Sequence, residues 1–234
     1  MQAHEHLRED KFESRSTLMV DLSSDTDSAG PSNLCVTDDL QGFEKIRSQG
    51  KNVLLYLWSP TSALKTMISR TPFTDLPSFS ATIASGNIDS LLSDAPDDLV
   101  KQTIIELRGV LQSFAALLPD GRLNIAFCKT HSRSCPLFHV DRVPFRLLCT
   151  LRGPGTEWLA DDDLRRRGLG KGNNRKVVKP GASVYEVLPF QVCVLKGESQ
   201  FANAGTGAVH RSPAVPDTIE GRWYLKVDPD GTAR

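Results

Sequence analysis

A series of short strand-like runs crowds the second half of the chain and constrains the fold more than any other feature. Each run is about as long as an ordinary β-strand and is bounded by turn residues. The runs cover residues 123–128, 145–151, 183–187, 191–195, 208–210 and 222–227. Gly and Pro separate them, as in residues 152–155 and 228–231, and such residues form tight turns. This closely spaced pattern favours a small barrel or jelly roll.

The preceding segment, residues 36–121, predicts mainly helices. Asp97 is suited to cap a helix, and the apolar residues after it recur at intervals of three and four. They are Leu99, Val100, Ile104, Leu107, Leu111, Phe114 and Leu118. Further helices are expected at residues 37–50 and 61–70, with a buried strand at 52–58. Residues 1–35 are polar without apolar periodicity and predict a flexible lead-in.

Together these patterns predict an α+β fold in three parts. A double-stranded β-helix, jelly-roll or cupin-like core is expected at residues 122–230, with the mainly helical layer of residues 36–121 packed on it. A chain of 234 residues can bury one substantial core of this kind,.

Charge and composition exclude several classes of protein. The chain has 28 Lys and Arg against 28 Asp and Glu, so its overall charge does not indicate a nucleic-acid or anionic-membrane binder. No apolar run approaches the length of about 20 residues that spans a bilayer. The amino-terminal residues lack the pattern of a secretory signal. Five cysteines, an odd number, fit reduced thiols,. A cytoplasmic protein is therefore expected.

A candidate metal site begins with His139 and Asp141. In an extended segment these two side chains project to the same side, although a histidine hydrogen-bonded to a carboxylate explains the pair equally well. His210 follows Asp141 by 69 positions (210 − 141), and Arg222 follows His210 by 12 (222 − 210). Two imidazoles and one carboxylate on one side of a metal leave the opposite positions free for oxygen and a substrate.

This order of residues resembles the iron(II)/2-oxoglutarate oxygenases, which are built on a double-stranded β-helix. The resemblance implies that His139, Asp141 and His210 hold Fe(II) and that Arg222 holds the distal carboxylate of 2-oxoglutarate. Arg146, five residues after Asp141, is a candidate second anion anchor, or a surface arginine. A separate resemblance covers most of the chain after about residue 40. Residues 139–159, together with 208–213, look like the bacterial family called domain of unknown function 1826, which implies no activity.

Several polar residues are candidates for substrate contact. Thr156, Glu157 and Trp158 follow a Gly-Pro-Gly turn and are expected at the rim of the barrel, either as a substrate-contacting lip or as a turn with an apolar anchor. Lys196 and Asn203 precede His210 and are candidate pocket-lining groups. The substrate itself, a small molecule or a protein, is not identified by these residues.

A competing site uses Cys128, His131, Cys135 and His139. Their C-x2-H-x3-C-x3-H spacing suits Zn(II) held by thiolates and imidazoles,. This alternative describes a non-catalytic zinc-binding accessory protein of cupin-like fold. Cys135 is otherwise a small buried residue or a redox-sensitive neighbour of the site.

A basic loop occupies residues 165–176, where six of twelve residues are Arg or Lys. It contains no aromatic residue for base stacking and follows three aspartates, so a solvated insertion or a lid is favoured over a nucleic-acid contact. The chain has no phosphate-binding loop, Rossmann glycine pattern or nucleophile elbow. Nucleotide and serine-hydrolase chemistries are therefore disfavoured.

Overall fold

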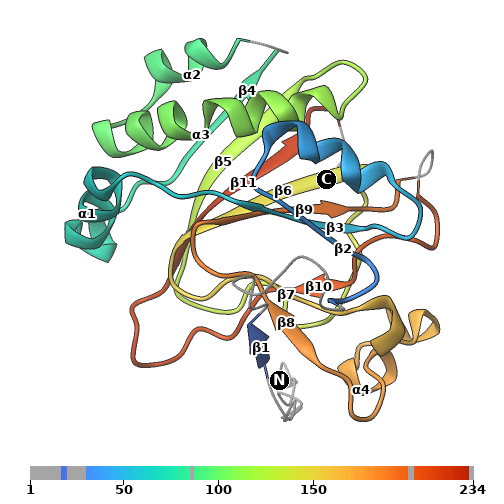
Figure 1. Ribbon diagram of the computed structural model, residues 1–234. Coiled ribbons are helices and arrows are strands. Elements are labelled where there is room, and N and C mark those ends of the chain that lie inside the picture. The colour runs from blue at the N-terminus through green and yellow to red at the C-terminus, as the bar shows by residue number, and fades with distance from the viewer. Residues whose placement is uncertain (1–16, 20–29, 85–86, 200–202, 232–234) are drawn as a thin grey trace, which may run out of the picture.

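Two β-sheets face each other, and helices cover the outer face of the larger one (Figure 1). The computed structural model describes residues 17–19, 30–84, 87–199 and 203–231. The large sheet has the order β2 (Leu34–Thr37), β3 (Val53–Leu57), β9 (Gln191–Lys196), β6 (Phe145–Arg152), β11 (Arg222–Pro229), β5 (Leu123–Thr130) and β4 (Phe79–Ile83). The small sheet has the order β1 (Thr17–Met19), β8 (Val184–Glu186), β7 (Glu157–Trp158) and β10 (His210–Arg211).

The chain alternates between the two sheets in the manner of a double-stranded β-helix. From β5 it crosses to the segment around His139, which pairs with His210 at the edge of the small sheet. It then runs through β6 in the large sheet, β7 and β8 in the small sheet, β9 in the large, β10 in the small and β11 in the large. The predicted α+β fold with a jelly-roll core is confirmed.

Alternation along the strands gives the large sheet two apolar faces. Leu147 and Cys149 of β6 belong to a cluster with the helices. Leu148, between them, packs with Trp158 of the small sheet. The inner face of β6 therefore carries every second residue, and the same alternation applies to β11.

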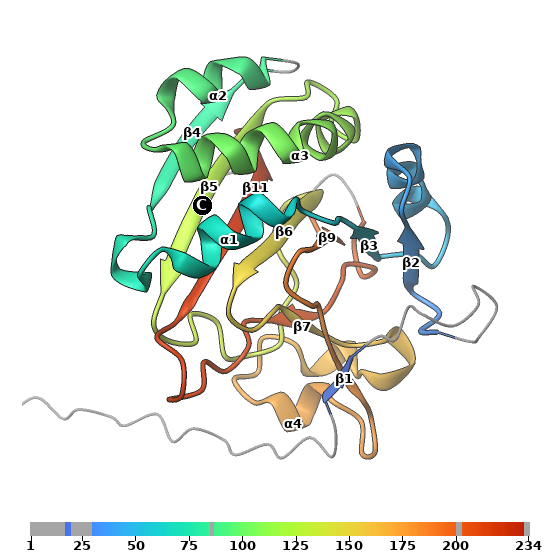
Figure 2. The same ribbon diagram turned by 60° about the vertical axis from the view of Figure 1, so that its left-hand side comes forward.

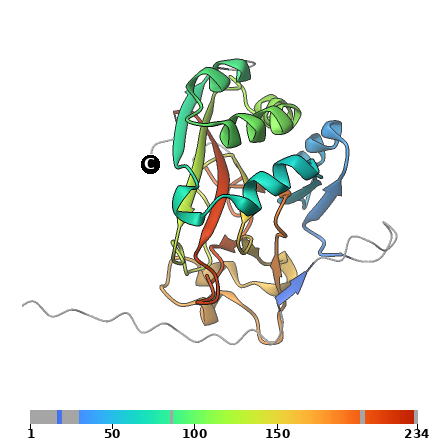
Figure 3. The same cartoon turned by 90° about the vertical axis from the view of Figure 1, so that its left-hand side faces the viewer.

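Helices form the outer layer on the large sheet. They are η1 (Leu40–Arg47, a 3-10 helix), α1 (Ser62–Arg70), η2 (Phe73–Asp75, 3-10), α2 (Ile88–Asp94) and α3 (Asp98–Ala116). Figures 2 and 3 show α1 and α3 along the same face of the sheet. The predicted helical layer, residues 36–121, also supplies half of β2 and all of β3 and β4 to the sheet.

Helix α3 forms where its sequence pattern predicts it. The Asp97 carboxylate accepts a hydrogen bond from the Val100 amide and so caps the first turn,. The residues repeating at intervals of three and four are buried, and Leu107 and Phe114 are completely buried. Full burial of such a side chain stabilises the fold by about 1.5–3 kcal/mol. No helix in the described part of the chain is long and apolar enough to cross a membrane.

The predicted flexible lead-in is described in part. Residues 1–16 and 20–29 lie outside the described residues, whereas β1 pairs in parallel with β8. Asn33 and Leu34 are buried, and the Asn33 side chain donates to Asn52. The last residues of this segment therefore belong to the folded core.

The basic loop packs on the outer face of the small sheet. It contains η4 (Arg166–Gly168, 3-10) and α4 (Asn174–Val177), and follows η3 (Asp161–Asp163, 3-10). Leu164 and Val178 form a β-bridge and are both buried. Asn174 accepts from the Phe138 amide and donates to the Pro136 carbonyl. These contacts anchor the loop to the segment that carries His139, in contrast to the solvated insertion expected from its composition.

Candidate metal centre

Three side chains converge between the sheets, as the sequence predicted. His139 and Asp141 lie on the segment between β5 and β6, and His210 lies on β10. Each offers one ligand atom within 4.8 Å of the others. The Nε2 atom of His139 lies 3.6 Å from Asp141 Oδ1, and Nε2 of His210 lies 3.2 Å from Asp141 Oδ2. Reciprocal backbone hydrogen bonds of 2.9 and 3.0 Å between His139 and His210 fix the two imidazoles side by side.

Backbone carbonyls fix the orientation of both imidazole rings. The Nδ1 atom of His139 lies 2.9 Å from the Leu137 carbonyl oxygen, and that of His210 lies 3.1 Å from the Ala208 carbonyl oxygen. Because a carbonyl accepts hydrogen bonds, each Nδ1 must donate. In a neutral ring this leaves an unprotonated Nε2 facing Asp141, which is the arrangement of a histidine that ligates a metal.

The charges of this cluster suit a bound cation. Asp141 Oδ2 is buried and has no hydrogen-bond partner among the described residues, since His210 Nε2 is near but poorly aligned. Burial opposes ionisation of Asp141, but His210, His139 and Arg146 together hold its pKa well below the usual range. Burial likewise opposes protonation of His139, yet hydrogen bonds to Asp141 and Leu137 raise its pKa. The three ligands therefore fit a divalent metal.

Arg146 holds the other oxygen of the Asp141 carboxylate. Its Nη1 atom donates to Asp141 Oδ1 at 2.5 Å. Its Nε and Nη2 atoms bind both oxygens of Asp228 at 2.6 and 3.1 Å. One guanidinium thus bridges the buried Asp141 and the half-buried Asp228, and leaves Asp141 Oδ2 beside His210. We call this set, Arg146 with Asp141 and Asp228, the carboxylate clamp. Arg146 is therefore committed to these two carboxylates, in contrast to the free anion anchor expected from the sequence.

Arg222 is a buried cation without an anionic partner. Its Nη2 atom donates to the hydroxyls of Thr150 at 3.0 Å and Thr156 at 2.9 Å. The guanidinium lies over the Tyr224 ring, 4.3 Å from its centroid. It is 3% exposed, and no carboxylate within the described ranges lies at ion-pair distance from it. Burial lowers the pKa of the guanidinium, so a bound anion would be stabilised here.

Arg222 and the clamp share the space between the sheets. Arg222, Tyr224 and Asp228 occupy alternate positions of β11 and so share one face,. Tyr224 packs in the cluster that joins the two sheets, which identifies this face as the inner one. Thr156, which binds Arg222, directly precedes β7, and β7 pairs with β10, the strand that carries His210. The structure therefore encloses a metal-ligand set and an unpaired cation between the same two sheets.

A family model described as protein of unknown function (DUF1826) matches residues 37–228. The chain belongs to this family. No curated protein sequence matches it.

Solved structures similar to this DUF1826 protein include several described with 2-oxoglutarate. AtDAO1, the dioxygenase for auxin oxidation 1 from Arabidopsis thaliana, in its 2-oxoglutarate complex, is 9% identical over 83% of this chain and 91% of that one, with a TM-score of 0.47. AviO1 from Streptomyces viridochromogenes is 14% identical over 85% and 98%, with a TM-score of 0.44. JOX2 in complex with 2OG, Fe and JA is 10% identical over 85% and 75%, with a TM-score of 0.47.

The three residues expected at an exposed rim of the DUF1826 barrel are all buried. Thr156 is 3% exposed and binds Arg222. Glu157 is paired with Arg211 at 2.5 Å. Trp158 is completely buried and stacks on Tyr185, with 4.7 Å between the ring centroids. The expected exposed lip is therefore absent at these positions, and Thr156 is the one that reaches the Arg222 site.

The two remaining candidates, Lys196 and Asn203, are both among the described residues and form no hydrogen bond or ion pair with the triad. Lys196 is directly opposite Phe145 in the sheet, and opposite residues share a face,. Phe145 packs with the helices, so Lys196 points to the helical side. The Asn203 side chain donates to the Pro144 carbonyl at 3.2 Å and holds its own loop.

The cysteine and histidine set is not assembled in this DUF1826 chain. Within the described ranges, His139, Asp141 and His210 are the one group of three metal-ligating side chains whose ligand atoms approach within 4.8 Å. His131 instead directs Nδ1 to the Glu220 carbonyl oxygen and packs edge-on against Phe73. Cys135 is exposed, whereas Cys128 is half-buried. A zinc site built on these residues has no support in the geometry.

Sequence reasoning did not identify Thr150, Tyr224 and Asp228 as part of this region. Because side chains alternate between the two faces of a strand, the spacing of each of these residues could have indicated its place. Thr150 is four residues after Arg146 on the same strand, and Tyr224 and Asp228 are two and six residues after Arg222. Once Arg146 and Arg222 are assigned to an inner face, these side chains follow on that face.

Proposed function

We propose that this DUF1826 protein is an iron(II)- and 2-oxoglutarate-dependent oxygenase. The observation that carries the proposal is the position of a metal-ligand set and an unpaired cation between the same two sheets. One is the His139, Asp141 and His210 set, which calls for a cation. The other is Arg222, which calls for an anion. A metal held by the ligand set, together with a dianionic 2-oxoglutarate that binds both this metal and Arg222, would satisfy both groups.

The ligand set suits iron chemistry. Two imidazoles and one carboxylate on one side leave positions for a co-substrate and oxygen. Bound Fe(II) would supply oxygen activation coupled to oxidative decarboxylation of 2-oxoglutarate. The carboxylate clamp restricts Asp141 to one free oxygen, so that this residue offers a single ligand atom and leaves the other positions open.

Arg222 and its neighbours would bind the distal carboxylate of 2-oxoglutarate. A guanidinium binds a carboxylate through two parallel hydrogen bonds, which lysine does not reproduce. The hydroxyls of Thr150 and Thr156 already hold the guanidinium in place and are themselves capable of donating to a carboxylate. Trp158 and Leu148, buried beside this space, would exclude water and so strengthen the interaction.

The test is 2-oxoglutarate-dependent succinate release by the purified protein with Fe(II). Replacing His139 with alanine should abolish release because a metal ligand is lost. Arg222→Gln should raise the KM for 2-oxoglutarate by about 10- to 100-fold, the equivalent of losing a charged hydrogen-bonded contact worth about 1.5–3 kcal/mol. Its metal content should remain that of the wild type.

Arg152→Gln is the matched control. Arg152 is on the neighbouring strand and is half-exposed, where it donates to the Thr71 carbonyl. This variant should release succinate with the wild-type KM. An unchanged KM in Arg222→Gln would contradict the assigned role of Arg222. Metal bound by the triad without any succinate release would contradict the oxygenase and favour the alternative of a non-catalytic metal-binding protein.

A further inference from the structure

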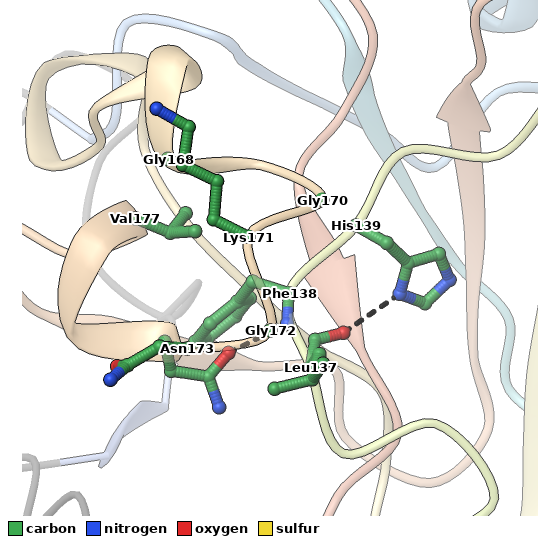
Figure 4. Close-up of a pocket in the computed structure, with 10 residues that line it drawn as sticks. Leu137, Phe138, His139, Gly168, Gly170, Lys171, Gly172, Asn173 and Val177 are labelled. Carbon is green, nitrogen blue, oxygen red and sulfur yellow. Dashed lines mark hydrogen bonds between the residues drawn. The ribbon is translucent and has the colours of Figure 1, made fainter.

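A second pocket lies on the outer side of the small sheet, beside the metal-ligand segment. It has a volume of about 230 Å³ and is lined by residues 137–139 on one side and by Gly168, residues 170–174 and Val177 on the other (Figure 4). Figure 4 shows the His139 ring directed away from this pocket. His139 therefore borders the pocket, while its ring faces Asp141 on the side of the triad.

The wall of this pocket is mostly apolar and contains no acidic residue. Leu137, Phe138 and Val177 contribute side chains, and Gly168, Gly170 and Gly172 contribute backbone. The Asn174 amide, also in the wall, is already bonded to Phe138 and Pro136. Leu137 is 41% exposed and adjoins the buried Phe138. The interior thus suits a small apolar group.

Lys171 lines the pocket, and three further basic residues lie close to it along the same loop. Arg167, Lys171, Arg175 and Lys176 are all exposed, and none has an ion-pair partner in the described segments. The two other arginines of the basic loop are differently placed. Arg166 is paired with Asp161 and Glu198, and Arg165 donates to the Val178 carbonyl. We call Arg167, Lys171, Arg175 and Lys176 the basic rim. Lys171 offers its charge to an anion at the pocket itself, and the other three add positive charge along the loop beside it.

We propose that this pocket binds a small amphipathic carboxylate, with its apolar body between Leu137 and Val177 and its carboxylate at the basic rim. The volume is below the range of about 300–1,000 Å³ typical of pockets for drug-sized ligands, so one or two rings or a short branched chain fill it. The basic loop has no aromatic residue on which a base would stack, which disfavours single-stranded nucleic acid.

This binding site has a direct connection to the metal centre. The Leu137 carbonyl, in the pocket wall, is the acceptor that fixes the His139 ring. A ligand that shifts the Leu137 backbone would therefore alter the orientation of a metal-ligating imidazole. Binding itself does not depend on the proposed oxygenase activity and is measured without it.

The test uses 2-naphthoate as the probe and 2-naphthalenemethanol as its neutral counterpart, each titrated into the full-length protein by calorimetry. The wild type should bind the carboxylate more tightly than the alcohol. The double variant Lys171→Glu with Arg175→Glu should weaken binding of the carboxylate at least tenfold and change binding of the alcohol less than twofold. Lys45→Glu with Lys65→Glu, a matched pair of exposed lysines on η1 and α1, should leave both unchanged.

A second pair of variants tests the pocket interior. Leu137→Asp should weaken both probes at least tenfold, whereas Ile105→Asp, at an exposed position of α3, should weaken neither. Near-ultraviolet circular dichroism establishes that each variant is folded. The proposal is overturned if neither probe binds at millimolar concentration, or if carboxylate binding survives charge reversal at the rim. It is also overturned if the rim binds a single-stranded oligonucleotide while 2-naphthoate does not compete.

Discussion

Replacing Arg146 with glutamine should destabilise the metal-free protein substantially. The guanidinium binds Asp141 at 2.5 Å and Asp228 at 2.6 Å, and the three side chains are 21%, 8% and 14% exposed. Without the cation, two largely buried carboxylates lose their shared counter-charge. Breaking a buried ion pair in this way costs about 3–5 kcal/mol. Because Arg146 is partly exposed, we expect the lower end, about 3 kcal/mol.

Urea unfolding of the metal-free protein measures this loss. Thermal unfolding should show the same loss: each kcal/mol of lost stability lowers Tm by about 2–4 °C in a chain of this size, so Tm should fall by about 6–12 °C. Adding a divalent metal should narrow the difference between the variant and the wild type, because a cation beside Asp141 replaces part of the missing charge.

Arg108→Gln is the control for this variant. Arg108 pairs with Asp89 at the surface, where the two side chains are 41% and 67% exposed, and such pairs contribute about 0–1 kcal/mol. Adding Asp228→Asn to Arg146→Gln should recover part of the lost stability, since one of the two unpaired carboxylates is removed. If Arg146→Gln costs no more than Arg108→Gln, the clamp does not hold Asp141 and the reasoning is wrong.

Three further predictions concern packing, backbone conformation and thiol chemistry. Leu107→Ala should lower the free energy of unfolding, measured in urea, by about 2–5 kcal/mol, because Leu107 is fully buried on the inner side of α3. Ile105→Ala, on the exposed side of α3, should lower it little. Equal losses would contradict the assigned helix faces. Gly153→Ala should lower the free energy of unfolding by about 1–3 kcal/mol, because Gly153 has φ of +90° and an added Cβ would lie 2.6 Å from a backbone carbonyl oxygen. An unchanged midpoint of urea unfolding would refute this strain. Iodoacetamide at pH 8, followed by mass spectrometry, should modify exposed Cys135 well before Cys149, since burial raises the pKa of the Cys149 thiol and keeps it protonated; modification of both at one rate would contradict the burial of β6.

The elements that the sequence predicted are those whose signal is local. Helix α3 follows from its Asp97 cap and from apolar residues repeating every three or four positions, all within one stretch of chain. Strands β2 and β7 were not predicted. β7 comprises two residues and exists through its pairing with β8 and β10. Such pairing is non-local, and strand patterns of two to four residues are too short to indicate it.

The candidate site likewise divides into residues with a local sequence signal and residues placed by non-local strand pairing. His139 and Asp141 were identified from their spacing along an extended segment, and His210 and Arg222 from their order after it. The clamp was not identified, because Asp228 lies 82 positions from Arg146 and the pair exists through the alignment of β11 beside β6. Similarly, Glu157 was expected at a rim, but its partner Arg211 lies 54 positions away. Charge pairing across a sheet is fixed by register, which single residues do not reveal.

The metal content of the purified protein tests the central claim most directly. We predict one divalent ion per chain after anaerobic purification and Fe(II) addition, measured by elemental analysis. The ion should be lost in His139→Ala, Asp141→Ala and His210→Ala and retained in Cys128→Ala and Cys135→Ala. An ion retained in His210→Ala but lost in Cys135→Ala would contradict the triad as the metal centre.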